Sequence, residues 1–124
     1  MKVHTVADRR DALRSKIPAL FELSGTPHFE ASLFESLNTL SPCRHLTAFV
    51  HELGGPPTTA IALNDGDRPV AISVANKYTA KYWRLDPINR LGREALRDDE
   101  IKSVLINPSD INDGDYRRDC YTSV

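Results

Sequence analysis

Residues 45–87 contain the sequence that decides the fold, HLTAFVHELGGPPTTAIALNDGDRPVAISVANKYTAKYWRLDP. At its start, Leu46, Ala48 and Val50 alternate with other residues, which is the period of a strand. A second run, Thr58 to Leu63, follows a Gly-Gly-Pro-Pro turn and ends at Asn-Asp-Gly, a strong turn signal. Two strands this close in the sequence predict an antiparallel hairpin.

The period then becomes helical. Apolar and aromatic residues recur at i, i+3, i+4, i+7, i+11 and i+14, which places them on one face of a helix. These residues are Ala71, Val74, Ala75, Tyr78, Tyr82 and Leu85. We expect the helix to end at Asp86-Pro87, because the residue before a proline avoids the helical conformation.

Two further helices are predicted upstream and form an N-terminal helical pair within residues 1–41. The first covers residues 6–23, with a kink near residues 15–17 caused by Pro18. Its apolar stripe is Val6, Leu13, Ile17, Leu20 and Phe21. The second begins at a Thr26-Pro27 cap. Its apolar face is Phe29, Leu33, Leu37 and Leu40, and it ends at Ser41-Pro42.

Downstream, residues 88–100 are polar and predict a loop, and Lys102–Ile106 predicts a third strand. A turn at Asn107–Asp110 and a short helix over Asp113–Tyr121 follow. The order α-α-β-β-α-β-α predicts one α+β domain over residues 1–124, with helices packed on an antiparallel sheet. Three strands make that sheet incomplete, with an exposed edge.

Composition limits the partners. Lys and Arg number 16 against 17 Asp and Glu, so the chain lacks the positive charge that binding many phosphates requires. We therefore expect no direct contact with nucleic acid. No apolar run approaches the ~20 residues of a membrane span, and the first residues show no export signal. Two cysteines are too few for a disulfide scaffold, so we expect a cytoplasmic protein.

Two segments carry a resemblance to a known family. The stretch 77–87, KYTAKYWRLDP, is similar to the aromatic helix that runs into Asp-Pro in the sensory domains of LuxR-type transcriptional regulators. The stretches 107–111, NPSDI, and 115–121, DYRRDCY, resemble a second segment of the same proteins. The resemblance follows the element order over most of residues 20–121. It implies a GAF- or PAS-like, ligand-sensing and dimerising domain.

The resemblance also implies a site. In the acyl-homoserine-lactone branch, an Asp at the position of Asp86 accepts a hydrogen bond from the ligand amide, and upstream aromatic residues line the pocket. This chain departs from that branch, because Ser73 or Val74 replaces a tryptophan one turn upstream, which argues against a homoserine lactone. The chain given also ends where such sensors continue, and it contains no helix-turn-helix.

The candidate ligand-binding residues are therefore Tyr78, Tyr82, Trp83 and Asp86. All four tyrosines and the tryptophan lie between residues 78 and 121, and such side chains suit a half-polar pocket. The alternative is structural: the tyrosines belong to the core and Asp86 caps the following turn.

Two other groupings are weaker candidates. Cys43, His45 and His51 could supply metal ligands, but an extended strand separates the two histidines by about 20 Å. Cys120 has a neighbouring arginine but no histidine after His51 to act as a base, so we expect no enzyme. No residue pattern predicts a metal or a cofactor.

The sequence thus predicts a regulatory domain that senses an unidentified small molecule and pairs with a second copy or with a partner regulator. The alternative is an interaction module without a ligand, which pairs with a full-length regulator through an exposed sheet edge.

Overall fold

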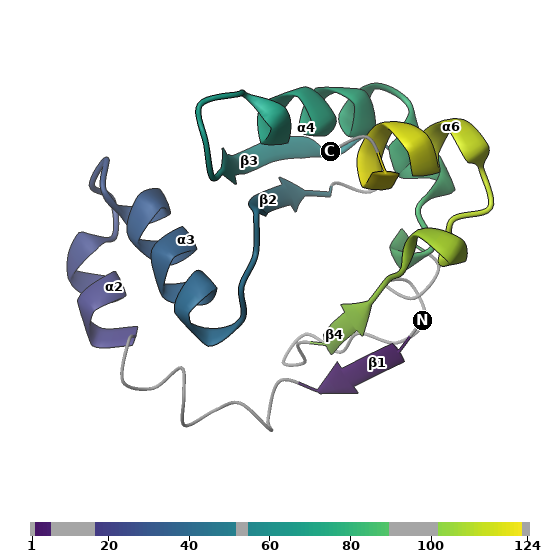
Figure 1. Cartoon of the computed structure of the whole chain (residues 1–124). Helices are drawn as coiled ribbons and strands as arrows, with labels where there is room; N and C mark the ends of the chain where they lie inside the picture. The colour runs from purple at the N-terminus through teal and green to yellow at the C-terminus, as the bar shows by residue number, and fades with distance from the viewer. Residues whose placement is uncertain (1, 6–16, 52–54, 90–101, 123–124) are drawn as a thin grey trace.

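The computed structural model describes residues 2–5, 17–51, 55–89 and 102–122, and shows an α+β fold (Figure 1). The elements, in chain order, are β1 (Lys2–Thr5), α2 (Ile17–Leu23), α3 (Phe29–Leu40), β2 (His45–Val50), β3 (Thr58–Asn64), α4 (Val70–Ala80), the 3-10 helix η2 (Tyr82–Leu85), β4 (Lys102–Leu105), the 3-10 helix η3 (Pro108–Asp110), α6 (Gly114–Arg117) and the π-helix η4 (Arg118–Thr122).

The predicted hairpin is confirmed: β2 and β3 pair antiparallel, from His45 opposite Asn64 to Val50 opposite Thr58. The register shifts between Ala48 and Phe49. Ala48 pairs with Ile61 and Phe49 with Thr59, so the extra residue is Ala60 and the bulge lies in β3. Beside this bulge Phe49 packs against the core, while Val50 is 53% exposed. The predicted alternation of Leu46, Ala48 and Val50 is therefore wrong at Val50.

Among the residues that the structure describes, two separate two-stranded sheets replace the predicted single sheet. The predicted third strand is confirmed as β4, but it pairs antiparallel with β1, from Lys2 opposite Leu105 to Thr5 opposite Lys102. The sequence pattern missed β1, because its four residues, KVHT, include a single apolar residue, Val3, and so show no alternation. Its partner also lies at the other end of the chain.

Helices α2 and α3 form a hairpin at one side of the molecule (Figure 1). Residues 6–16 of the predicted first helix lie outside the described residues. Phe21 is 75% exposed, so its place in the predicted apolar stripe is wrong. Leu20 and Leu23, three residues apart, share the half-buried face, and Phe21 is rotated away from it by about 100°.

The turn between these helices differs from the prediction in one detail. Gly25 adopts a positive φ of 78° and ends α2, a conformation that favours glycine. The Thr26 hydroxyl donates to the Leu23 carbonyl at 2.6 Å, so it closes α2 rather than capping α3. The cap position of α3 is His28, and α3 ends at Ser41 as predicted.

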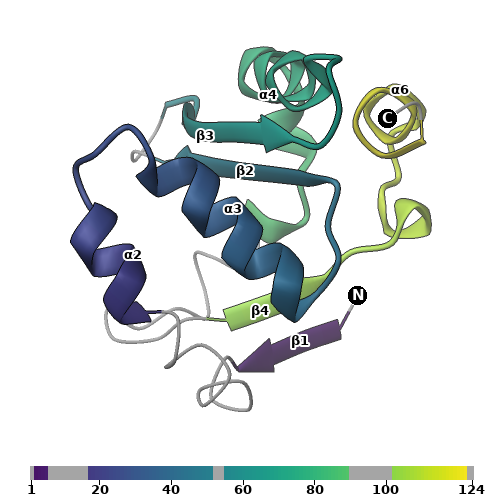
Figure 2. The ribbon, with the colours of Figure 1, turned by 60° about the vertical axis from the view of Figure 1, so that its left-hand side comes forward.

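The turn after β3 positions α4. The Asn64 side chain accepts a hydrogen bond from the Ala71 amide at 3.0 Å and donates to the Asp65 and Arg68 carbonyls, both at 2.8 Å. Gly66 has a φ of 81°, which the predicted Asn-Asp-Gly turn requires. Helix α4 then packs over β3, and Figures 1 and 2 both show it above that strand.

The apolar stripe of α4 is confirmed only in part. Its buried members are Ala71, Ala75, Tyr78 and Tyr82. The helix breaks at Lys81, whose φ and ψ are −146° and −36°, and continues as η2. Leu85 lies beyond this break and is 49% exposed, so its predicted place on the buried stripe is wrong.

The last predicted helix is confirmed as α6 followed by η4. It begins at Asp113, whose side chain accepts a hydrogen bond from the Tyr116 amide at 2.9 Å. Within the part of the chain that the structure describes, no helix has the length and apolar character needed to cross a membrane.

Candidate functional site

The core of the molecule lies where α4 and η2 meet the C-terminal helices. Tyr78, Tyr82, Ile111 and Tyr116 form its buried centre. Partly buried residues surround this centre, namely Phe49, Trp83, Ile106, Cys120 and Tyr121. We call these nine residues the aromatic cluster. Its members come from β2, α4, η2 and the segment that follows β4.

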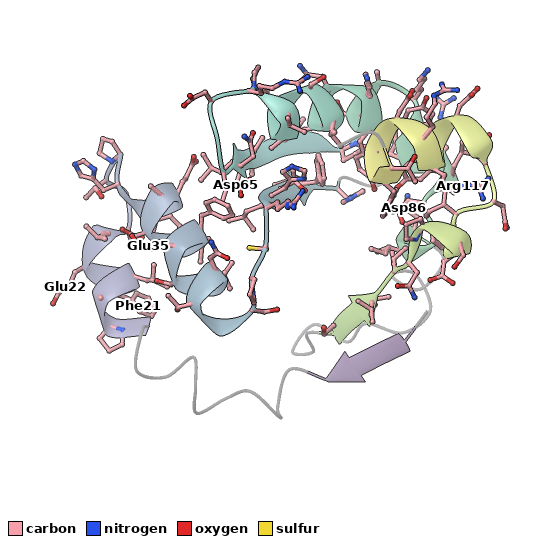
Figure 3. All side chains as sticks on the ribbon, viewed as in Figure 1. Phe21, Glu22, Glu35, Asp65, Asp86 and Arg117 are labelled. Atoms are coloured by element: carbon pink, nitrogen blue, oxygen red, sulfur yellow. The ribbon has the colours of Figure 1, made fainter. Side chains whose placement is uncertain are left out.

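Asp86 is held at the edge of this cluster and is 8% exposed. Its Oδ2 atom accepts a hydrogen bond from the Tyr78 hydroxyl at 2.6 Å, and its Oδ1 atom accepts one from the Ile88 amide at 2.9 Å. The second bond caps the turn that follows η2, so the structural role considered for Asp86 is present. Figure 3 shows Asp86 close to α6, which lies far along the sequence.

Tyr82 joins η2 to the C-terminal segment, which we define as Gly114–Thr122. Its hydroxyl donates to Asp119 Oδ2 at 2.5 Å, and Asp119 Oδ1 accepts from the Arg118 guanidinium at 3.1 Å. This hydrogen bond from Tyr82 is the main reason that the pKa of Asp119 is lowered, and it also raises the pKa of Tyr82. The Lys81 ammonium lies 4.6 Å from the centre of the Tyr82 ring.

Trp83 is the most open of the four predicted site residues. It packs against the cluster from η2 and is half-buried. The Arg84 guanidinium lies 5.3 Å from the centre of its ring, which is a cation–π distance. Its backbone carbonyl accepts a hydrogen bond from the Asn89 side chain.

The centre of the cluster is Tyr116, which is 1% exposed. Its ring stacks on Tyr82, with centroids 5.1 Å apart and planes 8° apart, and it lies 6.3 Å from the Tyr78 ring and 5.6 Å from the Tyr121 ring. Burial raises the pKa of Tyr116 above its usual range, and burial followed by the Asp86 hydrogen bond does the same for the pKa of Tyr78. Both phenols are therefore neutral hydrogen-bonding groups.

Cys120 is half-buried beside this cluster. Burial raises the pKa of its thiol to about 11, which disfavours the reactive thiolate. Among the described residues, no three His, Cys, Asp or Glu side chains are grouped so that they could hold a metal ion.

The structure thus brings Tyr78, Tyr82, Trp83 and Asp86 into one region. It adds Tyr116 and Asp119, which the sequence pattern did not assign to the site, although the concentration of tyrosines between residues 78 and 121 was a usable signal. Each buried polar side chain of the described residues has a hydrogen-bond partner. The arrangement offers one carboxylate, that of Asp86, as a hydrogen-bond acceptor beside aromatic rings. This carboxylate already accepts a hydrogen bond from the Tyr78 hydroxyl.

No protein-family model, curated protein or solved structure matches this chain.

Proposed function

We propose that this chain is a small-molecule-sensing regulatory domain of the LuxR type, with a GAF- or PAS-like fold, which acts through ligand binding and dimerisation. One observation supports this proposal above the others. The two segments that carry the resemblance, residues 77–87 and 107–121, pack together in the aromatic cluster. Two segments that each served only local structure would have no reason to meet. Their contact supports the view that both belong to one site, beside Asp86.

The chemistry of this region indicates the class of ligand. Asp86 accepts hydrogen bonds, so the ligand needs an N–H or O–H donor. Tyr78, Tyr82 and Trp83 offer aromatic surfaces, so the rest of the ligand is apolar. Because Asp86 already bonds the Tyr78 hydroxyl, the ligand donor competes with that hydroxyl.

A matched pair of probes tests this proposal. We would measure the thermal shift of the chain with a panel of small aromatic amides and with the corresponding esters, which lack the N–H donor. We expect an amide to raise the melting temperature where its ester does not, because ligand binding stabilises the folded state. The shift is expected to fall in Asp86→Ala and Tyr82→Ala. A probe that stabilises both variants as much as the unsubstituted chain would refute the site.

A ligand-free interaction module is the second candidate, and the exposed apolar side chains favour it. Val50, Leu85, Ile88 and Leu105 are each more than two-fifths exposed. Each two-stranded sheet also has an outer edge that no other described strand covers. Native mass measurement separates the two candidates: a monomer that binds an amide supports the sensor, and an obligate dimer that binds none of the probes supports the module.

A further inference from the structure

The C-terminal segment is attached to the rest of the molecule largely through hydroxyl and ring contacts of two tyrosines. Tyr82 stacks on Tyr116 and hydrogen-bonds Asp119, so it contacts both α6 and η4. Tyr78 contacts the Tyr116 ring and hydrogen-bonds Asp86. Tyr78 therefore contacts both Asp86, the candidate ligand acceptor, and the C-terminal segment.

The position of Tyr78 couples its hydrogen bond with Asp86 to the packing of the C-terminal segment. Its ring lies between Phe49 of β2, 4.6 Å away, and Tyr116 of α6. The hydrogen bond from its hydroxyl to Asp86 helps to fix the orientation of this ring, so loss of that bond allows the ring to turn. Rotation of the ring disturbs the contact with Tyr116 because packed cores do not deform continuously.

We propose that the C-terminal segment, Gly114–Thr122, is a regulatory switch whose docking depends on the Tyr78–Asp86 hydrogen bond. When Asp86 bonds another donor, Tyr78 is released and the segment loosens; when Tyr78 bonds Asp86, the segment is held. This regulation rests on the proposed function for its trigger. The coupling itself is a property of the ligand-free chain, so it is tested separately.

Cys120 provides a probe inside the switch. Its thiol is half-buried in η4, and it reacts with a thiol reagent when the segment opens. A Cys43→Ser background leaves it as the single cysteine. In that background we would measure the rate at which Ellman's reagent modifies Cys120 in the variants Tyr78→Phe, Asp119→Asn and both together. Amide hydrogen exchange would report on residues 114–122 and on β2–β3.

We expect Tyr78→Phe to raise the Cys120 reaction rate about five- to tenfold, the factor by which loss of one buried hydrogen bond shifts an opening equilibrium. Exchange should rise in residues 114–122 and stay unchanged in β2–β3. The effects of Tyr78→Phe and Asp119→Asn should not multiply, because both loosen the same segment. Thr79→Ala is the matched control, since its hydroxyl bonds only carbonyls of its own helix.

Two results would overturn the switch. One is a Cys120 rate in Tyr78→Phe within twofold of the Thr79→Ala control. The other is equal increases in exchange for residues 114–122 and for β2–β3, which would indicate global unfolding. Should Tyr78→Phe fail to fold, Asp86→Asn provides the same test, because it keeps the side-chain shape but weakens the acceptor. If the rates change as expected while no amide probe binds, the switch stands and the proposed ligand fails.

Discussion

The helical hairpin α2–α3 and the aromatic cluster bury their side chains very differently. None of the side chains described in residues 18–39 is buried, and Phe21 is the most exposed of the large apolar residues. In the cluster, by contrast, Tyr116 and Ile111 are almost completely buried. Both regions show helical apolar periodicity, so periodicity alone does not decide burial. A stripe is buried only where other elements cover it.

The contrast also concerns residue type. The four tyrosines all lie at or after residue 78, and the four phenylalanines all lie before residue 50. Tyrosine can occupy the crowded centre because its hydroxyl finds a carboxylate, as Tyr78 does with Asp86 and Tyr82 with Asp119. These paired hydroxyls fix the geometry of the cluster in a way that the apolar face of α2–α3 does not. Figure 3 shows Phe21 and Asp86 at opposite sides of the molecule.

The largest expected effect is that of Tyr116→Ala. Removing a fully buried aromatic side chain lowers the free energy of unfolding by about 3–5 kcal/mol. Phe21→Ala is the matched change in the hairpin, and we expect it to alter that free energy by less than about 0.5 kcal/mol, because the ring is exposed. Urea unfolding followed by circular dichroism measures both.

Equal losses in Tyr116→Ala and Phe21→Ala would contradict this comparison. They would show that another surface covers Phe21 in solution. An unfolding midpoint that depends on concentration in the unsubstituted chain but not in Phe21→Ala would identify that surface as an interface between copies of the chain.

A smaller effect tests whether Phe49 or Val50 faces the core beside the bulge. Phe49 packs half-buried against Tyr78, so Phe49→Ala should lower the free energy of unfolding by about 2 kcal/mol, roughly half the value for a fully buried ring. Val50 is exposed, so Val50→Ala should lower it by less than about 1 kcal/mol. Urea unfolding is again the measurement. The reverse order would mean that Val50 and not Phe49 faces the core, as regular alternation from Leu46 and Ala48 predicts.

The sequence predicts an element of this structure when the residues that determine the element lie within it. The hairpin, α4 and the helix after Asp113 were predictable, because turn residues and apolar period lie within each element. The inward position of Phe49 was not, since it depends on how the ring meets Tyr78 of α4. Strand β1 was not predictable either, because Val3 is its single apolar residue and its partner β4 lies far away in the sequence.

The candidate site was predictable only on its α4 side. Tyr78, Tyr82, Trp83 and Asp86 stand close together in the sequence, and the helix end brings them together. Tyr116 and Asp119 reach the same region through β4 and the turn at η3. That path depends on long-range packing, so apolar periodicity could not assign those two residues to the site, and only the concentration of tyrosines after residue 78 indicated Tyr116.

The smallest expected effect comes from alkaline pH and again separates the two regions. An unfolded tyrosine has a pKa near 10, and the folded pKa values of Tyr78 and Tyr116 are raised above it. Their stabilising contribution is therefore complete below pH 10 and is lost as the pH rises toward the folded pKa values. By pH 10 the unfolded chain gains about 0.4 kcal/mol from each of these tyrosines.

The Cys120 thiol would contribute in the same direction, since burial also raises its pKa, so the measurement uses a Cys120→Ala background. We would compare urea unfolding at pH 8.5 and pH 10 and follow tyrosinate absorbance at 295 nm. We expect lower stability at pH 10 with little tyrosinate signal from the folded chain, and loss of part of that pH dependence in Tyr78→Phe. A strong tyrosinate signal at pH 10 without unfolding would mean that the hydroxyls of the cluster are open to water, and the contrast with α2–α3 would then rest on ring packing alone.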